Sequence, residues 1–264
     1  MRENPPLITL TTDFGYQDYY TAAMKAAILR INPQARMIDI SHALPPQDIM
    51  AGAWVLKNAA FDFPPGTVHL CVVDPGVGSD RRPLICEIEG HFFVGPDNGL
   101  FPLTASGKNL RAREIQNQDF MRKPVSNTFH GRDIFAPAAA YLSTGTPPEA
   151  FGPVVEKPVY YRWAEPIADQ EGVQGWVSHI DTYGNLITNI PQNLLPENGN
   201  PGVKIYAGSA ILDAVEHCYS SVTEGEPLAL IGSSGMLEIS VRDGNAAEML
   251  SARKGTVVSV VFKK

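Results

Sequence analysis

The sequence predicts an α/β protein: an N-terminal layered α/β domain followed by a smaller C-terminal all-β domain of barrel-like form. In the first half, short β-branched runs alternate with segments of helical periodicity, which is the pattern of strands and helices packed in layers. After about residue 148, helical periodicity gives way to short β-like runs separated by turn residues. We expect the domains to span residues 1–165 and 166–264, with residues 150–170, rich in proline and aromatic side chains, as linker and edge.

The first strands and helices follow in order from the N-terminus. Residues 7–12 form a short β-branched run and predict the first strand. Residues 19–31 place alanine and aliphatic side chains on one helical face, and Asn32-Pro33 ends that helix. Residues 36–40 predict a second strand. Residues 46–58, with aliphatic side chains at helical spacing, predict a second helix.

A buried third strand is predicted over residues 68–73, because this run is almost wholly apolar. Residues 84–89 and 91–94 predict a hairpin that turns at Gly90. Residues 135–142 predict a further helix. In the C-terminal domain, β-like runs predict strands over residues 175–180, 203–206, 227–231, 237–241 and 256–262.

The composition is that of an ordinary globular protein, and it argues against several classes. A net charge of −7 argues against a nucleic-acid-binding protein, which would present a basic face. No apolar run approaches the ~20 residues of a transmembrane helix, and residues 1–6 lack the apolar core of a signal peptide. Cys71, Cys86 and Cys218 form neither a CxxC pair nor a zinc pattern. We therefore expect a cytoplasmic protein with reduced thiols and no metal site.

Polar clusters lie at the ends of predicted elements, where open α/β sheets place their chemistry. Asp13 follows the first strand, and its carboxylate either accepts hydrogen bonds from vicinal ribose hydroxyls or caps a turn. Asp74 opens a glycine-rich turn that also carries Arg81, and His130 precedes a helix. One Asp, one Arg and one His could hold and polarise a water molecule. A solvated Arg81-Arg82 pair and a structural histidine are the alternative interpretations.

Six segments in colinear order, spanning almost the whole chain, carry a family resemblance. They are TTDFG (residues 11–15), VVDPGVGSDRR (72–82), VGPDNGL (94–100), TFHGRDIFAPAAA (128–140), DTYGNLITNI (181–190) and GSSGMLEISV (232–241). In these segments the chain resembles the S-adenosyl-L-methionine (SAM) hydrolases, also called SAM hydroxide adenosyltransferases, which are related to fluorinase and chlorinase. The resemblance implies the two-domain fold expected above and a homotrimer. It also implies active sites between the N-terminal domain of one subunit and the C-terminal domain of its neighbour.

The resemblance further implies an activity, the hydrolysis of SAM to adenosine and L-methionine by attack of an activated water or hydroxide on C5′. The family's water-activating set falls on Asp74, Arg81 and His130, and its ribose-binding acid falls on Asp13. Further substrate contacts fall on Asp18, Tyr19, Tyr20, Asp181, Asn185, Ser233, Ser234, Glu238 and the backbone near Val241. SAM is then the substrate, no metal or other cofactor is expected, and neither nucleic acid nor a membrane is expected as a partner.

Two alternative functions stay open. A SAM-dependent halogenase resembling chlorinase would bind SAM in the same site and use a halide ion, in place of water, as the nucleophile. The halogenases lack the Asp and His of the water-activating set, and the fluorinase serine that donates to fluoride falls on Gly131 here. The other alternative is a non-catalytic protein that binds adenosine or SAM, which would have no need of the water-activating residues.

Overall fold

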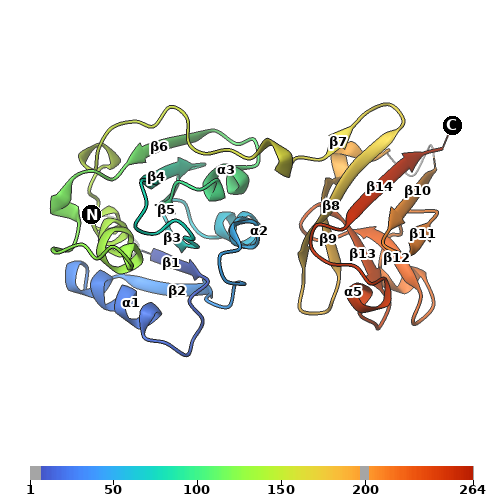
Figure 1. Ribbon diagram of the computed structural model, residues 1–264, viewed down its shortest axis with the longest axis horizontal. Helices are drawn as coiled ribbons and strands as arrows, with labels where there is room; N and C mark the ends of the chain where they lie inside the picture. The colour runs from blue at the N-terminus through green and yellow to red at the C-terminus, as the bar shows by residue number, and fades with distance from the viewer. Residues whose placement is uncertain (1–6, 197–201, 264) are drawn as a thin grey trace. The chain divides into compact units, whose positions relative to one another are not determined.

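The computed structural model describes residues 7–196 and 202–263, which form two compact units (Figure 1). The units span Met1–Tyr160 and Tyr161–Lys264, whereas the sequence pattern predicts a boundary after residue 165. The first unit combines helices with a mixed sheet, and the second is a nearly closed antiparallel sheet. The predicted fold class, a layered α/β domain followed by an all-β barrel-like domain, is confirmed.

The N-terminal unit is built on a six-stranded sheet with the order β2-β1-β3-β5-β4-β6. Its strands are β1 (Leu7–Thr12), β2 (Arg36–Ser41), β3 (Val68–Val72), β4 (Pro83–Ile88), β5 (His91–Pro96) and β6 (Leu110–Glu114). The first four in this order pair in parallel, and β4 pairs antiparallel with β5 and β6. Its α-helices are α1 (Tyr20–Ile31), α2 (Ile49–Ala59), α3 (Leu100–Ala105) and α4 (Ala136–Ser143).

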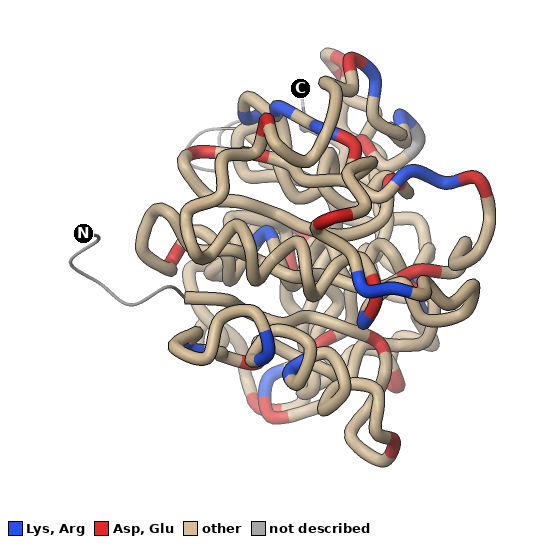
Figure 2. The backbone as a smooth tube through the Cα atoms, turned by 90° about the vertical axis from the view of Figure 1, so that its left-hand side faces the viewer, with Lys and Arg blue, Asp and Glu red and all other residues tan. Residues whose placement is uncertain are grey.

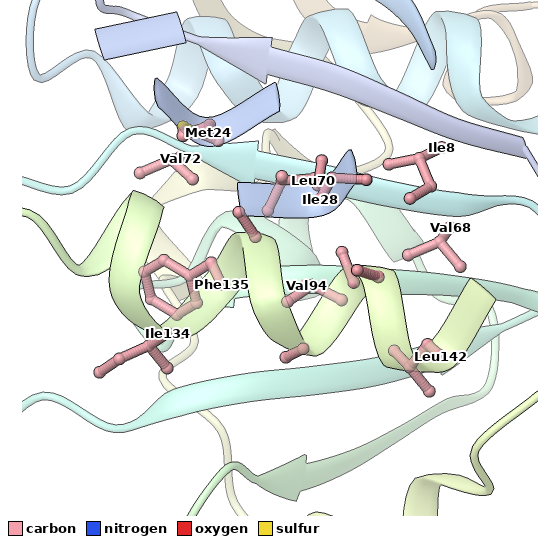
Figure 3. Close-up of a cluster of buried hydrophobic side chains, with 14 of the residues drawn as sticks. Ile8, Met24, Ile28, Val68, Leu70, Val72, Val94, Ile134, Phe135 and Leu142 are labelled. Carbon is pink, nitrogen blue, oxygen red and sulfur yellow. The ribbon is translucent and has the colours of Figure 1, made fainter. Parts of the chain in front are cut away.

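Both faces of the central strands are buried, which explains the continuous apolar run in β3. Alternate side chains of a strand point to opposite faces, so Leu70 packs with α1 and α4, whereas Cys71 packs with α2 and α3. Figure 3 shows the first of these two cores, where side chains from β1, β3 and β5 meet Met24 and Ile28 of α1 and Phe135 beside α4. Parallel strands need crossover connections, and the helices of those connections cover the sheet.

Several N-terminal elements begin at positions set by their end residues. The helix predicted over residues 46–58 begins at Ile49, because Gln47 has a positive φ of 64° and the Asp48 carboxylate accepts a hydrogen bond from the N–H of Ala51 at 3.0 Å. The predicted hairpin turns through Glu89 and Gly90, both with positive φ. Before α4, one turn of π-helix spans Gly131–Phe135.

The C-terminal unit is an antiparallel sheet with the strand order β11-β10-β14-β8-β9-β13-β12, with β7 paired to β8. Its strands are β7 (Ile167–Ala168), β8 (Gly172–Ile180), β9 (Leu186–Pro191), β10 (Val203–Ala207), β11 (Ala210–Leu212), β12 (Pro227–Ile231), β13 (Met236–Val241) and β14 (Val257–Phe262). A short helix, α5 (Ala246–Met249), precedes β14. One apolar core fills this unit, with Val177, Ile205, Ile239 and Val258 at 0% exposure.

Charged residues of both signs are interspersed along the described backbone on the side that Figure 2 presents. The chain as a whole carries an excess of acids, with a net charge of −7. None of the helices in the described part of the chain is long and apolar enough to cross a membrane.

A buried histidine network ties β1, β3 and β5 together in the N-terminal unit. The hydroxyl Oγ1 of Thr9 lies 2.7 Å from Nδ1 of His69, and Nε2 of His69 lies 3.1 Å from Nδ1 of His91. The His69 ring also stacks on Phe93, with ring centroids 4.8 Å apart. Burial, reinforced by the charge of His91, lowers the pKa of His69 to about 3.

We expect stability to fall as the pH drops below the usual histidine range. Folded His69 stays neutral down to a pH of about 3, whereas unfolded His69 binds a proton below about pH 6.5. The unfolded state therefore binds more protons between these values, and the free energy of unfolding decreases by up to about 1.4 kcal/mol per pH unit at this site.

Urea unfolding of the wild type and of the double variant Thr9→Val/His69→Phe, at several pH values across this range, measures the effect. The double variant removes the titrating ring together with the hydroxyl that bonds to it, so its stability should depend less steeply on pH. An equal pH dependence in the two proteins would contradict the assignment to His69.

Candidate functional site

Two carboxylates lie at the same edge of the N-terminal sheet. Asp13 directly follows β1, and Asp74 follows β3 by two residues. The two strands are adjacent and parallel, with Thr12 opposite Val72, so both carboxylates leave the sheet at its C-terminal edge. The negative charge of Asp74 contributes to raising the pKa of Asp13, after the larger effect of burial. This edge is where open α/β sheets bind ligands.

Arg81 joins Asp74 and His130 into one cluster. Its Nε donates to Oδ1 of Asp74 at 2.9 Å, and its Nη2 donates to Oδ2 of the same carboxylate in a two-pronged ion pair. The same Nη2 lies 2.7 Å from Nδ1 of His130. The structure therefore brings together all three residues that the sequence analysis assigned to one water, although they lie up to 56 positions apart (130 − 74 = 56).

The protonation of His130 follows from its partner. A guanidinium can only donate, so Nδ1 of His130 accepts the hydrogen bond, and the neutral ring carries its hydrogen on Nε2. Burial lowers the pKa of His130, and the positive charge of Arg81 lowers it further. His130 therefore presents an N–H donor, and not a lone pair, on the side away from Arg81.

The guanidinium of Arg81 keeps two hydrogens without a protein partner. Its side chain is 9% exposed, and its carbon Cζ lies 5.0 Å from the centroid of the Phe135 ring. Among the described residues, buried Nη1 has no hydrogen-bond partner. An unpaired buried donor is costly, and such donors mark positions that a polar ligand or solvent atom can occupy.

Residues outside the predicted set hold this cluster in place. The amide of Asn98 donates to the carbonyl of Val73 at 2.8 Å, at the residue before Asp74. Arg82 pairs with the buried carboxylate of Asp97, which also accepts from the N–H of Val159 at 2.8 Å. The sequence Pro96-Asp97-Asn98-Gly99 marks a turn, but only the fold shows that the turn lies against the end of β3.

Asp13 has one oxygen engaged by its own unit. Its Oδ2 accepts a hydrogen bond from the N–H of Gln47 at 2.7 Å. Burial raises the pKa of Asp13, while this backbone bond opposes the increase. Among the described residues no side chain donates to Asp13 in a hydrogen bond, so the carboxylate keeps acceptor capacity for a ligand.

The other predicted N-terminal residues lie at the surface. Asp18 is exposed, Tyr19 is 64% exposed and Tyr20 is 38% exposed. The two tyrosine rings pack together with the ring of Phe129, which directly precedes His130. They therefore form an aromatic surface next to the cluster, and no hydrogen bond joins them to Asp74 or Arg81 in the described residues.

In the C-terminal unit, Asp181 and Asn185 form one turn. Oδ1 of Asp181 accepts from the backbone N–H groups of Tyr183 and Asn185, both at 2.9 Å, and Oδ2 accepts from the amide of Asn185 at 2.9 Å. This turn joins β8 to β9, and Ile187 of β9 pairs with Glu238 of β13. The strand pairing therefore places Asn185 near the C-terminal half of β13.

Glu238 is a buried carboxylate, 6% exposed, with one oxygen fully engaged. Its Oε1 accepts from the hydroxyl of Tyr219 at 2.7 Å and from that of Ser240 at 2.8 Å. Burial raises the pKa of Tyr219, and the hydrogen bond to Glu238 raises it further, so the phenol remains a donor. Tyr219 is absent from the predicted set, because it lies on a separate loop with no local motif.

The remaining predicted residues surround Glu238 or its strand. Ser233 and Ser234 occupy the turn between β12 and β13, next to Gly232, where an added Cβ would lie 2.5 Å from Oε2 of Glu238. The side chain of Val241 is in the core at 4% exposure, so only its backbone can meet a ligand. In the described part of the chain, no three His, Cys, Asp or Glu side chains are placed to hold a metal ion.

Comparison with known proteins matches both units to one family. Residues 8–152 match the SAM hydroxide adenosyltransferase N-terminal domain, and residues 175–259 match the SAM hydroxide adenosyltransferase C-terminal domain. The chain belongs to the SAM hydroxide adenosyltransferase family. A member of similar length, the (R)-S-adenosyl-L-methionine hydrolase of Salinispora tropica, is 37% identical over 262 residues, which are 95% of each chain.

A solved structure and a more distant enzyme complete the comparison. An uncharacterized conserved protein from Thermotoga maritima has a TM-score of 0.87 at 37% identity, over 96% of this chain and 99% of that one. The fluorinase of Actinoplanes sp. is 23% identical over 97% of each chain. This SAM hydroxide adenosyltransferase family member is thus nearer in sequence to the hydrolase of Salinispora tropica than to that fluorinase.

In this family member, Gly78 allows two loops of the cluster to meet, and Gly131 packs against α1. Gly78 has a φ of +80°, and a Cβ there would lie 2.4 Å from the carbonyl oxygen of Asn127, in the loop that leads to His130. A Cβ on Gly131 would lie 3.2 Å from Sδ of Met24. The Arg81–His130 contact therefore depends on close backbone approach at Gly78.

We expect Gly78→Ala to destabilise the protein more than Gly107→Ala. Both glycines have positive φ, 80° and 85°, but an added Cβ at Gly107 meets no atom within 4 Å. Gly107→Ala should therefore cost about 1 kcal/mol of backbone strain alone. Gly78→Ala adds a clash with backbone that only a loop shift can relieve.

Thermal unfolding of the two variants beside the wild type measures this difference. Equal losses of stability would contradict the close packing of the two loops at Gly78.

Proposed function

We propose that the protein hydrolyses SAM to adenosine and L-methionine. The observation that supports this proposal most directly is the Asp74–Arg81–His130 cluster, with buried Nη1 of Arg81 unpaired among the described residues, beside Asp13 at one sheet edge. Membership in the SAM hydroxide adenosyltransferase family, with relatives named (R)-S-adenosyl-L-methionine hydrolase, supplies the substrate.

The reaction needs an oriented nucleophile and little else. The oxygen of water forms a bond to C5′ of SAM while the C5′–sulfur bond breaks, and the electron pair of that bond neutralises the sulfonium to the thioether of methionine. One proton leaves the attacking water. Because the leaving group is a neutral thioether, the protein need not stabilise a leaving anion, and alignment of water with C5′ supplies much of the rate.

In this proposal, Arg81 and His130 donate hydrogen bonds to the attacking oxygen. Nη1 of Arg81 and the Nε2–H of His130 are the donors that the cluster does not use internally. Two donors aimed at one oxygen, one of them charged, favour hydroxide over water. Asp74 fixes the guanidinium through both of its oxygens and is the carboxylate that accepts the released proton.

The remaining residues bind the substrate. Asp13 accepts hydrogen bonds from the ribose 2′ and 3′ hydroxyls, and Asp18, Tyr19 and Tyr20 border the nucleoside. The methionine and adenine groups contact Asp181, Asn185, Ser233, Ser234, Glu238 and the backbone near Val241. Tyr219 keeps Oε1 of Glu238 occupied, so Oε2 is the oxygen left for a ligand donor.

The assembly and the conditions of action belong to the same proposal. We expect a cytoplasmic homotrimer that completes each active site from the N-terminal unit of one subunit and the C-terminal unit of its neighbour. We expect it to work without a metal ion or redox cofactor and to prefer the R epimer at sulfur, as the names of the relatives specify for those proteins. Light scattering after gel filtration measures the assembly.

Conservative changes in the cluster should each lower turnover by about 10²- to 10⁴-fold. The variants are Asp74→Asn, Arg81→Lys and His130→Asn. His130→Asn is the sharpest of them, because the asparagine oxygen can replace Nδ1 as the acceptor from Arg81 while the Nε2–H donor is lost. Adenosine and methionine released from SAM are measured by chromatography, with Lys123→Ala, an exposed surface change, as control.

The same assay separates the proposal from its alternatives. Equal amounts of adenosine and methionine support hydrolysis. Formation of 5′-chloro-5′-deoxyadenosine at high chloride would instead indicate a halogenase, and binding of SAM without product over hours would indicate a binding protein. Unchanged turnover in all three cluster variants would refute the assignment of the cluster.

The pH dependence of turnover should follow the neutral form of His130. Its pKa is lowered by burial and by Arg81, so the ring stays neutral below the ordinary histidine range and turnover persists there. At still lower pH, Nδ1 of His130 becomes protonated and can no longer accept the hydrogen bond from Arg81. Turnover therefore falls. The rate measured against pH should show this acidic fall in the wild type below the ordinary histidine range, and in His130→Asn the fall should move to lower pH, because the Asp74 carboxylate still has to accept the released proton. An acidic fall at the same pH in the variant as in the wild type would contradict the role of His130.

A further inference from the structure

One buried histidine, His42, holds the chain on both sides of Asp13. Nδ1 of its ring lies 2.7 Å from Oγ1 of Thr12. Its backbone carbonyl accepts a hydrogen bond from the N–H of Gly15 at 2.7 Å. His42 itself is 1% exposed. Asp13 thus lies in the four-residue segment from Thr12 to Gly15, both ends of which are held by the side chain or backbone of His42.

An irregularity in the strand pairing brings His42 to this place. β1 and β2 pair in regular register up to Leu10, which lies opposite Asp39, and then Thr11 pairs with Ser41. One extra residue in β2 therefore bends that strand at its C-terminal end. The next residues, Thr12 and His42, come level with each other, and their side chains meet.

The contacts around His42 form a chain with a defined direction. Nε2 of His42 lies 3.1 Å from Oδ1 of Asp39, within ion-pair distance but without hydrogen-bond geometry, and Oδ2 of Asp39 accepts from Lys25 at 2.6 Å. A carboxylate attracts a donor and repels a lone pair, so Nε2 carries the hydrogen and Nδ1 accepts from the hydroxyl of Thr12. Oγ1 of Thr12 is then free to accept from the N–H of Phe14 at 3.3 Å. Burial lowers the pKa of His42, in keeping with a neutral ring.

We infer that His42 is a positioning residue for the ribose-binding carboxylate of Asp13 and that it acts through the hydroxyl of Thr12. The inference rests on the proposed function. Hydrogen bonds to two vicinal hydroxyls need both oxygens of one carboxylate in a fixed plane, and among the described residues the Asp13 carboxylate receives bonds from backbone N–H groups, those of Gln47 and of Asp13 itself, and none from a side chain. Its orientation therefore depends on how its backbone neighbours are held.

The test compares Thr12→Val with Thr12→Ser, and adenosine with 2′,3′-dideoxyadenosine. Valine has the shape of threonine without the hydroxyl, whereas serine keeps the hydroxyl. Thr12→Val should weaken adenosine binding about tenfold in calorimetry, the loss expected when a bond to a charged group is misplaced. It should leave the binding of dideoxyadenosine, which has no hydroxyls for Asp13 to hold, within about twofold of wild type. Thr12→Ser should restore adenosine binding.

A matched control lies three residues earlier in the same strand. Thr9 makes an equivalent contact, with Oγ1 2.7 Å from Nδ1 of His69, but it does not flank Asp13. Thr9→Val removes one buried Thr–His hydrogen bond from β1, as Thr12→Val does. It should leave the affinity for adenosine unchanged. Equal losses in the two variants would show a general effect on the sheet and would overturn the inference.

The ring nitrogens of His42 provide a second, independent comparison. His42→Asn keeps an acceptor near Nδ1 for Thr12, whereas His42→Gln keeps a donor near Nε2 for Asp39. The inference predicts that His42→Gln weakens the binding of adenosine more than His42→Asn does. The opposite order of affinities would overturn it.

Failure of this inference and failure of the proposed function give different results. If the wild type neither hydrolyses SAM nor binds adenosine, the proposed function is wrong. If the wild type binds adenosine and Asp13→Asn weakens that binding, but Thr12→Val does not, only the positioning role of His42 is wrong. If Thr12→Val lowers the affinity for adenosine and for dideoxyadenosine to the same extent, the positioning role is also refuted. Such a result would show that the substitution does not act through the contacts of Asp13 with the ribose hydroxyls.

Discussion

The buried ion pair between Arg81 and Asp74 is the interaction on which the N-terminal site depends. A guanidinium at 9% exposure needs a paired carboxylate, and Asp74 provides both oxygens. The pair fixes the plane of the guanidinium, so Nη2 meets His130 and Nη1 has no protein partner in the described residues. The unpaired donor is a cost that a ligand oxygen accepting from Nη1 would remove.

Two threonines of β1, Thr9 and Thr12, each contact a buried histidine, but the two contacts have different structural roles. Thr9 and His69 lie inside the sheet, where the bond satisfies a buried ring whose pKa is strongly lowered. Thr12 and His42 lie at the end of the same strand, where the bond holds a loop that leaves the sheet. The difference comes from position along β1 and from the register shift in β2, not from the chemistry of the pair.

The sequence was sufficient to predict the fold class and most strands, because the buried strands are apolar runs bounded by turn residues. It missed β6, a strand of largely polar residues (LRARE), and α3, which is only six residues long and contains Pro102. It also missed β9, which directly follows the Asp181–Asn185 turn, and the short elements β7, β11 and α5. The Asp74–Arg81–His130 cluster was predicted through the family motifs, and no spacing along the chain alone shows that the three side chains meet. Asn98, Tyr219 and His42 were not singled out, because their roles arise from contacts between distant segments.

The two units carry polar groups of different kinds, and this difference bears on what each can do. The N-terminal unit holds a fixed positive charge with unused donors, which favours a developing anion such as hydroxide. The C-terminal unit holds a buried carboxylate, Glu238, whose neighbours Tyr219 and Ser240 are neutral donors. A carboxylate with one oxygen engaged suits recognition of an amino or ammonium group.

A halide would also be favoured by the charge of Arg81. Two features nevertheless favour hydroxide over halide. Met24 limits the space for a serine side chain at position 131. The neutral His130 ring presents an N–H donor, which suits the small, strongly accepting oxygen of hydroxide.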